Sequence, residues 1–354
     1  MDVSVQLIFQ NYGNWLDERE HVAAELRLAE MAEPLGYAAL FVVEHHFFDY
    51  SACPDNAQFL SWLAARTSRM RLGTGAFILP WNNPLRVAEK IVLLDHLSGG
   101  RAVLGLGRGL ARREYAGFGI DMNESRDRFD EAAQMILDAC ERGVIEGDGP
   151  YYPQPRVEIR PRPLRGFRDR LYTIGMSPES VEQAARFGAR LAIFSQMPWA
   201  MWKETNYAAY RNAWRTTHNS EPPPPMTTDM MYCGESDAEA EDMARRHMVE
   251  YYLSVMEHYE IMGDHFKGVR GYEMYAQASD ILQHIGKQDQ ADAYLMVQSW
   301  GSPRRVIEQL RERWETIGPF ELSVIPRYGT LPPAKAEASF RRFAEQVMPE
   351  LSRW

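Results

Sequence analysis

The sequence predicts an α/β fold, a single (β/α)8 barrel in which eight parallel strands alternate with helices. Short apolar runs alternate with amphipathic stretches along most of the chain, an order typical of a parallel sheet covered on both faces. Eight apolar runs are present, which is the number that closes such a barrel. An open doubly wound sheet has the same alternation, so the periodicity leaves that alternative open.

The predicted strands are short apolar runs, mostly followed by a turn and an amphipathic segment. They cover residues 3–9, 38–43, 70–79, 101–106, 171–174, 191–194, 227–232 and 320–325. The predicted helices cover residues 17–35, 56–68, 84–97, 124–142, 178–187 and 303–316. Their ends carry the expected signals: Gly36 follows the first helix and Pro84 opens the third, as helix termini favour.

Two segments depart from the alternation. Residues 150–166 are rich in proline and arginine, which predicts a short hairpin or an ordered loop. Residues from about 234 to 300 are helical in pattern and rich in Met and Tyr, and they lie between the seventh and eighth strands. Long barrel insertions usually belong to active-site loops. We therefore expect 1–354 to form one domain, with the 234–300 insertion over the active-site face; Met and Tyr at helical spacing are equally typical of core packing.

Composition excludes several classes of protein. The 354 residues carry 39 basic and 49 acidic side chains, a net charge of −10, whereas a nucleic-acid-binding surface requires a basic patch. Three scattered cysteines, Cys53, Cys140 and Cys233, predict neither a disulfide framework nor a cysteine zinc site. The first residues lack a basic segment and no long apolar run follows, so we expect a cytoplasmic enzyme that does not span a membrane.

Glu44, His45 and His46 lie where the second predicted strand ends, at the rim where barrels carry their active sites. Adjacent residues of an extended chain point to opposite sides, so the two histidines are poorly placed to chelate one metal, and we predict no metal site. One of them is expected to face the pocket as a hydrogen-bond donor or base. The alternative is a structural histidine bonded within the rim.

Two loops on the same face are suited to an anion. The run GLGRGL at 105–110 brings bare backbone and the guanidinium of Arg108 to the end of the fourth strand. Leu110 stands where a dinucleotide fingerprint needs a third glycine, and tight packing alone also explains the glycines. In GMSPES at 175–180, Ser177 is a helix cap, and the free amides there, with Ser177 and Ser180, could hold phosphate.

Two further features remain open from the residues alone. Gly75 and Ala76 interrupt the third strand, which is typical of a bulge or of close approach by a ligand. Met197, Trp199 and Trp202 follow the sixth strand and could wall a flat apolar cavity. Plain packing is the alternative for these aromatic side chains.

Several strings occur in order along the sequence: EHHFFDYSACPDN at 44–56, RLGTGAFILPWNNPLRVAEKIVLLDHLSGGR at 71–101, GLGRGL at 105–110 followed by Glu114 and by FG at Phe118-Gly119, SRDRFDE at 125–131, SPES at 177–180, SPRRVIEQL at 302–310 and GPFELSVIPRYG at 318–329. Together they resemble the bacterial luciferase-like flavin monooxygenases of the alkanal monooxygenase alpha-chain type. The resemblance is dense over 36–135 and weakest over about 200–300. It implies a barrel that binds FMN at its C-terminal face.

The resemblance also implies roles for individual residues. Arg108 and the backbone of Leu110 would hold the flavin phosphate, and the loop after the fifth strand would complete the cradle through Met176, Ser177 and Ser180. Luciferase has an acidic residue in place of Met176 and a reactive cysteine in place of Gly107. The flavin ring would lie against an unusual cis peptide matched by Gly75 and Ala76. The catalytic histidine would be His45, with Glu44 behind it.

The activity that the resemblance implies is that of a two-component monooxygenase. Reduced FMN, supplied by a separate flavin reductase, would react with dioxygen to a 4a-hydroperoxyflavin that oxygenates a small organic substrate. His45 would act as base or hydrogen-bond donor, and the chain is expected to form a homodimer. Two alternatives remain: a deazaflavin-dependent oxidoreductase on the same barrel, and a non-catalytic flavin-binding partner subunit.

Overall fold

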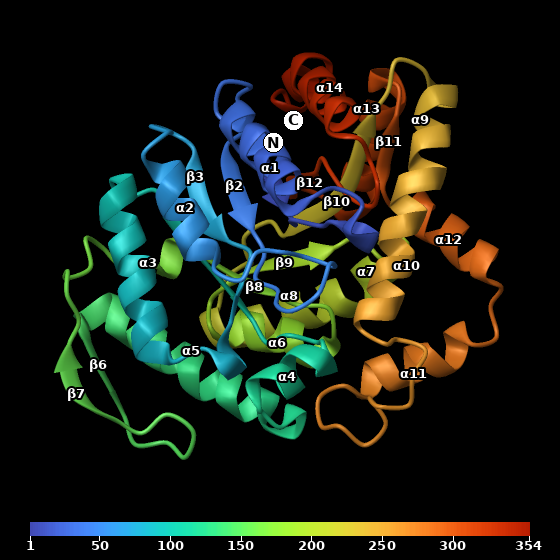
Figure 1. Ribbon diagram of the computed structural model, residues 1–354. Helices are drawn as coiled ribbons and strands as arrows, with labels where there is room; N and C mark the ends of the chain where they lie inside the picture. Colours follow the sequence, from blue (N-terminus) through green and yellow to red (C-terminus); the bar gives the residue numbers. More distant parts are fainter.

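The computed structural model describes residues 1–354 and is a closed barrel of eight parallel strands surrounded by helices (Figure 1). The pairing of β9 with β10 and of β12 with β1 closes the sheet, which confirms the TIM barrel and rules out the open sheet. Around the barrel the strands are β1 (Val3–Leu7), β2 (Ala39–Val42), β3 (Arg71–Thr74), β5 (Ala102–Gly107), β8 (Leu171–Ile174), β9 (Arg190–Phe194), β10 (Met226–Cys233) and β12 (Glu321–Ile325).

Most of the outer helices lie where the sequence predicts them. They are α1 (Glu18–Ala32), α2 (Asn56–Ala64), α3 (Pro84–Ser98), α5 (Ser125–Arg142), α6 (Pro178–Arg186) and α13 (Pro303–Ile317). The structure adds α4 (Arg112–Phe118), α7 (Trp199–Trp202), α8 (Ala208–His218), α14 (Pro333–Gln346) and α15 (Met348–Leu351). The last two bring the C-terminus to the N-terminus, where the amino group of Met1 donates to the Leu351 carbonyl (Figure 1).

The third predicted strand is interrupted. β3 ends at Thr74 and a two-residue strand, β4 (Phe77–Ile78), continues the pairing with β5. The peptide bond between Gly75 and Ala76, at the break, is cis, as the resemblance implies. The Gln6 side chain reaches across from β1 and donates to the Gly75 carbonyl at 3.0 Å, so the break lies at the end of the barrel interior.

The proline- and arginine-rich segment belongs to an antiparallel hairpin, as one of the two predicted alternatives states. Its strands are β6 (Val144–Gly147) and β7 (Gln154–Glu158), with a register shift between Ile145 and Gly147. The hairpin lies outside the barrel, beyond α5 (Figure 1).

The insertion between the seventh and eighth barrel strands folds as α9 (Asp237–Met243), α10 (Val249–His258), α11 (Glu273–Leu282), α12 (Lys287–Met296) and the short strand β11 (Ser299–Gly301), which pairs with β10 (Figure 1). Its Tyr251 and Tyr294 are buried in a cluster with Ile8, Val43 and Tyr50 from the barrel rim. Met262, by contrast, is 42% exposed. Part of the Met- and Tyr-rich pattern is therefore packing against the strand ends.

No helix of the structure combines the length and the apolar character that crossing a membrane would require.

A buried ion pair between Arg170 and Asp95 joins α3 to the barrel strands. Arg170, just before β8, donates to Asp95 of α3 at 2.8 Å between Nη2 and Oδ2, and also to the Ala102 carbonyl of β5. The exposed fractions of the two side chains are 5% and 1%. Removing one member of such a pair leaves an uncompensated buried charge.

We expect Asp95→Asn to lower the free energy of unfolding by about 3–5 kcal/mol, because Arg170 then stays buried without its counter-charge. Urea unfolding at pH 7 measures this change. The matched control is Asp169→Asn, which breaks only the exposed pair with Arg165 and should shift stability by no more than about 0.5 kcal/mol. Equal effects in the two variants would contradict the role given to Asp95.

Candidate active site

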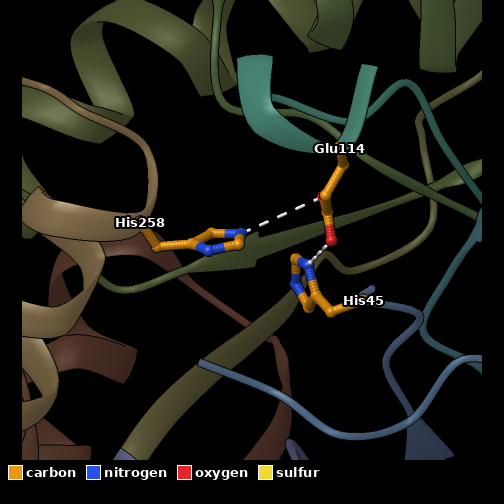
Figure 2. Close-up of side chains that lie close together, drawn as sticks. All are labelled: His45, Glu114 and His258. Atoms are coloured by element: carbon orange, nitrogen blue, oxygen red, sulfur yellow. Dashed lines mark hydrogen bonds and ion pairs between the residues drawn. The ribbon is translucent and has the colours of Figure 1, made fainter. Parts of the chain in front are cut away.

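The centre of the open face is a carboxylate–imidazole pair. Glu114, on α4, is 1% exposed and accepts a hydrogen bond from Nδ1 of His45 at 3.0 Å and from the backbone N–H of His46 at 2.7 Å (Figure 2). Burial alone would raise the pKa of Glu114, but His45, His258 and the His46 N–H outweigh it and hold the pKa below its ordinary value. An ionised Glu114 fixes the proton of His45 on Nδ1, so Nε2 is left as the basic nitrogen.

Glu44 occupies a different place from the one that the resemblance implies. Its Oε1 lies 3.2 Å from Nε2 of His46 and accepts hydrogen bonds from Trp81 and Asn82. Its other oxygen accepts from the backbone N–H of Ile78. Glu44 therefore ties the end of β2 to the chain after β4, and the acid behind His45 is Glu114.

His258, at the end of α10, approaches the same carboxylate from the insertion (Figure 2). Its Nε2 is 3.9 Å from Oε2 of Glu114, and its ring stacks on Tyr50 with 4.2 Å between centroids and 10° between planes. Burial, followed by the proximity of His45, lowers the pKa of His258 to about 3. His258 is therefore a neutral imidazole near neutral pH. Sequence reasoning missed it because a histidine among Met and Tyr at helical spacing carries no local motif.

Arg108 follows β5, as predicted, and one half of its guanidinium is already engaged. Nη2 donates to the carbonyl of Gly271 at 2.8 Å, and the guanidinium carbon lies 4.0 Å from the ring centre of Tyr272. Nη1 is buried and has no hydrogen-bond partner. A buried, unpartnered guanidinium nitrogen is costly to the fold and suits an anionic ligand.

Arg126, at the start of α5, is a second cation at this place that the sequence analysis did not single out. Its Nη2 is also buried without a partner. Burial and then the neighbouring charge of Arg108 lower the pKa of the Arg126 guanidinium. Its place in the SRDRFDE string was visible in the sequence, but nothing local showed that α5 would bring it beside Arg108.

A polar cavity of about 360 Å³ opens next to these arginines. It runs from α5 along the length of α6, and Gly271 of the insertion forms part of its wall. The lining residues are Arg126, Asp130, Glu179, Gln183, Arg186, Arg270, Gly271 and Glu273.

The loop after β8 caps α6 as the sequence predicts. The Ser177 side chain accepts from the Ser180 N–H at 3.3 Å, and Ser180 Oγ accepts from the Ser177 N–H at 2.9 Å. The two hydroxyl groups also bond within this capping box. Met176 is partly buried against the core, and its carbonyl accepts from Asn206.

The predicted aromatic wall encloses only a small space. Met176, Phe194, Met197, Trp199 and Trp202 line a cavity of about 10 Å³, room for no more than a water molecule. At this place the packing alternative is the better description. Gly107 also packs closely, since a Cβ there would lie 2.9 Å from Ile78.

Comparison with curated proteins finds one uncharacterized relative and several monooxygenases. An uncharacterized protein, y4wF of Sinorhizobium fredii, is 38% identical over 170 residues, 48% of this chain and 50% of that protein. The 4-hydroxyprotoasukamycin monooxygenase of Streptomyces nodosus subsp. asukaensis is 34% identical over 182 residues, 49% and 47% of the two chains. The match thus spans about half the length of these two relatives. An alkanal monooxygenase alpha chain of Aliivibrio fischeri is 26% identical over 328 residues, 90% of each chain.

Solved structures share the fold over nearly the whole chain. The monooxygenase RslO1 of Streptomyces bottropensis is 26% identical, with a TM-score of 0.75 over 99% of this chain and 100% of its own. The oxygenating constituent of 3,6-diketocamphane monooxygenase of Pseudomonas putida, in complex with FMN, is 18% identical with a TM-score of 0.77, covering 99% of both chains. A coenzyme F420-dependent tetrahydromethanopterin reductase of Methanopyrus kandleri is 16% identical with a TM-score of 0.71, covering 99% of both.

A family profile matches most of the chain. Residues 1–319 match the profile described as luciferase-like monooxygenase, which is most of the chain and includes both the His45–Glu114 pair and the arginines beside the polar cavity. The chain belongs to the luciferase-like monooxygenase family.

Proposed function

We propose that the protein is an FMN-dependent monooxygenase that uses reduced FMN and dioxygen to oxygenate a small organic substrate. The observation that carries the proposal is the pair of partly buried guanidinium groups, Arg108 and Arg126, each with one buried nitrogen that lacks a partner, on the same barrel face as the His45–Glu114 pair. A phosphate there would receive charge-assisted hydrogen bonds and relieve the repulsion between the two cations.

The residues of this face fit the FMN phosphate. Arg108 Nη1 and Arg126 Nη2 would bind its oxygens, with the backbone of Leu110 beside them. Met176, Ser177 and Ser180 would contribute through the loop that begins α6, where the helix dipole favours an anion. Because the hydroxyl and backbone N–H groups of Ser177 and Ser180 bond within the capping box, we infer that this loop acts mainly through the dipole of α6. The backbone at Gly75 and Ala76 would face the flavin ring.

When bound, reduced FMN supplies the electrons that activate dioxygen. The chain supplies a base: His45, with Nδ1–H donated to Glu114, can take a proton at Nε2 or donate it back. Glu114 stabilises the imidazolium that forms. The stacked rings of Tyr50 and His258 cover the pair on one side and exclude water from it.

Two partners follow from the same proposal. A separate flavin reductase would supply reduced FMN, and a second copy of the chain would complete a homodimer through the early barrel helices. Leu93 and Leu97 support the second point, since they are 48% and 54% exposed on α3, and contiguous exposed apolar side chains are typical of interfaces.

Anaerobic titration of the protein with reduced FMN and with reduced deazaflavin tests the proposal. We expect tighter binding of reduced FMN, followed by oxygenated product when dioxygen and a substrate panel are added. Tighter binding of the deazaflavin would favour the F420-dependent reading instead. Flavin binding without any oxygenated product across the panel would favour a non-catalytic subunit.

We expect Arg108→Ala to weaken reduced FMN binding by about 10- to 100-fold, because a charge-assisted phosphate contact is lost. Arg108→Lys keeps the positive charge but loses the planar guanidinium group. Its affinity for reduced FMN should therefore lie between those of the wild type and of Arg108→Ala. Arg160→Ala, an exposed arginine of the outer hairpin region, serves as control and should bind as the wild type does. Anaerobic titration monitored by flavin absorbance measures all four proteins, and equal affinities would remove Arg108 from the site.

We expect His45→Ala to keep its affinity for reduced FMN and to form product about 100-fold more slowly, because a positioned base is removed. Single-turnover product formation after mixing the loaded protein with oxygenated buffer measures the change. His46→Ala is the matched control, because His46 bonds to Glu44; its product formation should fall far less. A wild-type rate in His45→Ala would contradict the role of this histidine.

A further inference from the structure

His258 is a buried imidazole without a hydrogen bond. It is 3% exposed, and both of its ring nitrogens lack a partner. Buried polar groups are nearly always hydrogen-bonded, so an exception requires a physical reason. The ring is held in place by Tyr50, on which it stacks, and by the edges of His45 and Tyr259 at 5.4 and 4.8 Å.

The nearest acceptor for His258 is the free end of the Glu114 carboxylate. Both hydrogen bonds of Glu114 reach Oε1, from His45 and from the His46 backbone. Oε2 faces His258 Nε2 at 3.9 Å, so a movement of about 1 Å would make a hydrogen bond. Figure 2 shows the two imidazoles next to each other, each pointing toward a different oxygen of the one carboxylate.

The charges around His258 favour a neutral donor. The titratable groups that face it are Tyr50 from the loop after β2, His45, Glu114 and Arg113 from α4, and Tyr259 next in the chain. Burial, and then the charges of His45 and Arg113, lower the pKa of His258 to about 3 against the opposing charge of Glu114. A neutral imidazole beside an ionised carboxylate carries its proton on the nitrogen that faces the oxygen.

We propose that His258 is a positioning residue for His45: its N–H holds the second oxygen of Glu114, so that the first oxygen stays committed to Nδ1 of His45. The proposal rests on the proposed function, in which His45 is the base. The insertion thereby takes part in the site, because α10 places His258 next to His45, which follows β2, and Glu114, which is on α4.

A metal ion is the alternative explanation for the unpartnered nitrogens. His45, Glu114 and His258 each offer one donor atom, and these atoms lie within 4.8 Å of one another, the residue types of a two-histidine, one-carboxylate site. Glu114 Oε1, however, already has two hydrogen bonds to the chain, which favours the positioning role. The experiment below separates the two.

The experiment compares His258→Phe, His258→Gln and the control His284→Phe in the full-length chain without flavin. Phe keeps the ring that stacks on Tyr50 and removes both nitrogens, whereas Gln keeps an N–H donor. His284 is an exposed histidine of the same insertion, bonded only to the Asp280 carbonyl. NMR of protein labelled with ¹⁵N-histidine measures how fast the Nδ1 proton of His45 exchanges with water at pH 7.

We expect exchange about tenfold faster in His258→Phe, because Glu114 then lacks the N–H that holds its second oxygen in the proposed arrangement and is free to turn away from His45. His258→Gln should restore most of the protection, and His284→Phe should match the wild type. Product formation by the flavin-loaded proteins should follow the same order, while affinity for reduced FMN stays unchanged, since His258 has no contact with Arg108.

Two results would overturn the positioning role. One is exchange in His258→Phe equal to that of the wild type, which would reduce His258 to a packing residue. The other is a bound divalent ion in the purified wild type that is absent from His258→Phe, which would make the three residues a metal site. Because exchange is measured without flavin, both results are independent of the titrations that test the proposed function.

Discussion

Closure of the sheet by the pairing of β12 with β1 is the constraint on which the site depends. Eight parallel strands that close into a barrel must end on the same rim, so residues far apart in sequence meet there without any local signal. The end of β2 carries His45, the chain after β5 carries Arg108 and Glu114, and the chain after β10 carries the insertion with His258. An open sheet would spread the same residues along an edge.

The sequence predicts the repeating part of this structure and misses the parts that break the repeat. Each barrel strand is a short apolar run, and periodicity finds all eight. It does not find α8, in which Tyr210 is the one buried residue, or α14, which follows the last strand. Gly75 was the one sign in the sequence that the third strand is split into β3 and β4. A glycine within a strand predicts an irregularity but not its geometry.

The site divides in the same way. Loops next to strand ends, with Arg108 and the Ser177 cap, could be placed from sequence because each adjoins a predicted element. The carboxylate that bonds His45 could not be predicted from the sequence. Glu44 is adjacent to His45 in the chain, whereas the actual partner, Glu114, lies 69 residues further on. Tertiary packing decides the matter: Glu44 turns toward Trp81 and Asn82, and α4 delivers Glu114 instead.

The net negative charge of the chain affects how this rim can bind phosphate. A protein with a net charge of −10 repels phosphate at long range, so binding must come from a few cations with little water around them. Arg108 and Arg126 meet that requirement because the fold brings them close together and buries one unpartnered nitrogen of each. Asp130, Glu179 and Glu273 share the adjoining cavity and limit how much negative charge can be added beyond the two guanidinium groups.

The bond from Arg108 Nη2 to the Gly271 carbonyl makes one side chain common to two equilibria. The same guanidinium donates to the insertion through Nη2 and has an unpartnered nitrogen, Nη1. An anion bound at Nη1 that alters the Nη2 hydrogen bond would change the stability of the docked insertion. The docked insertion would then change the affinity for the anion by the same factor, since linkage is reciprocal.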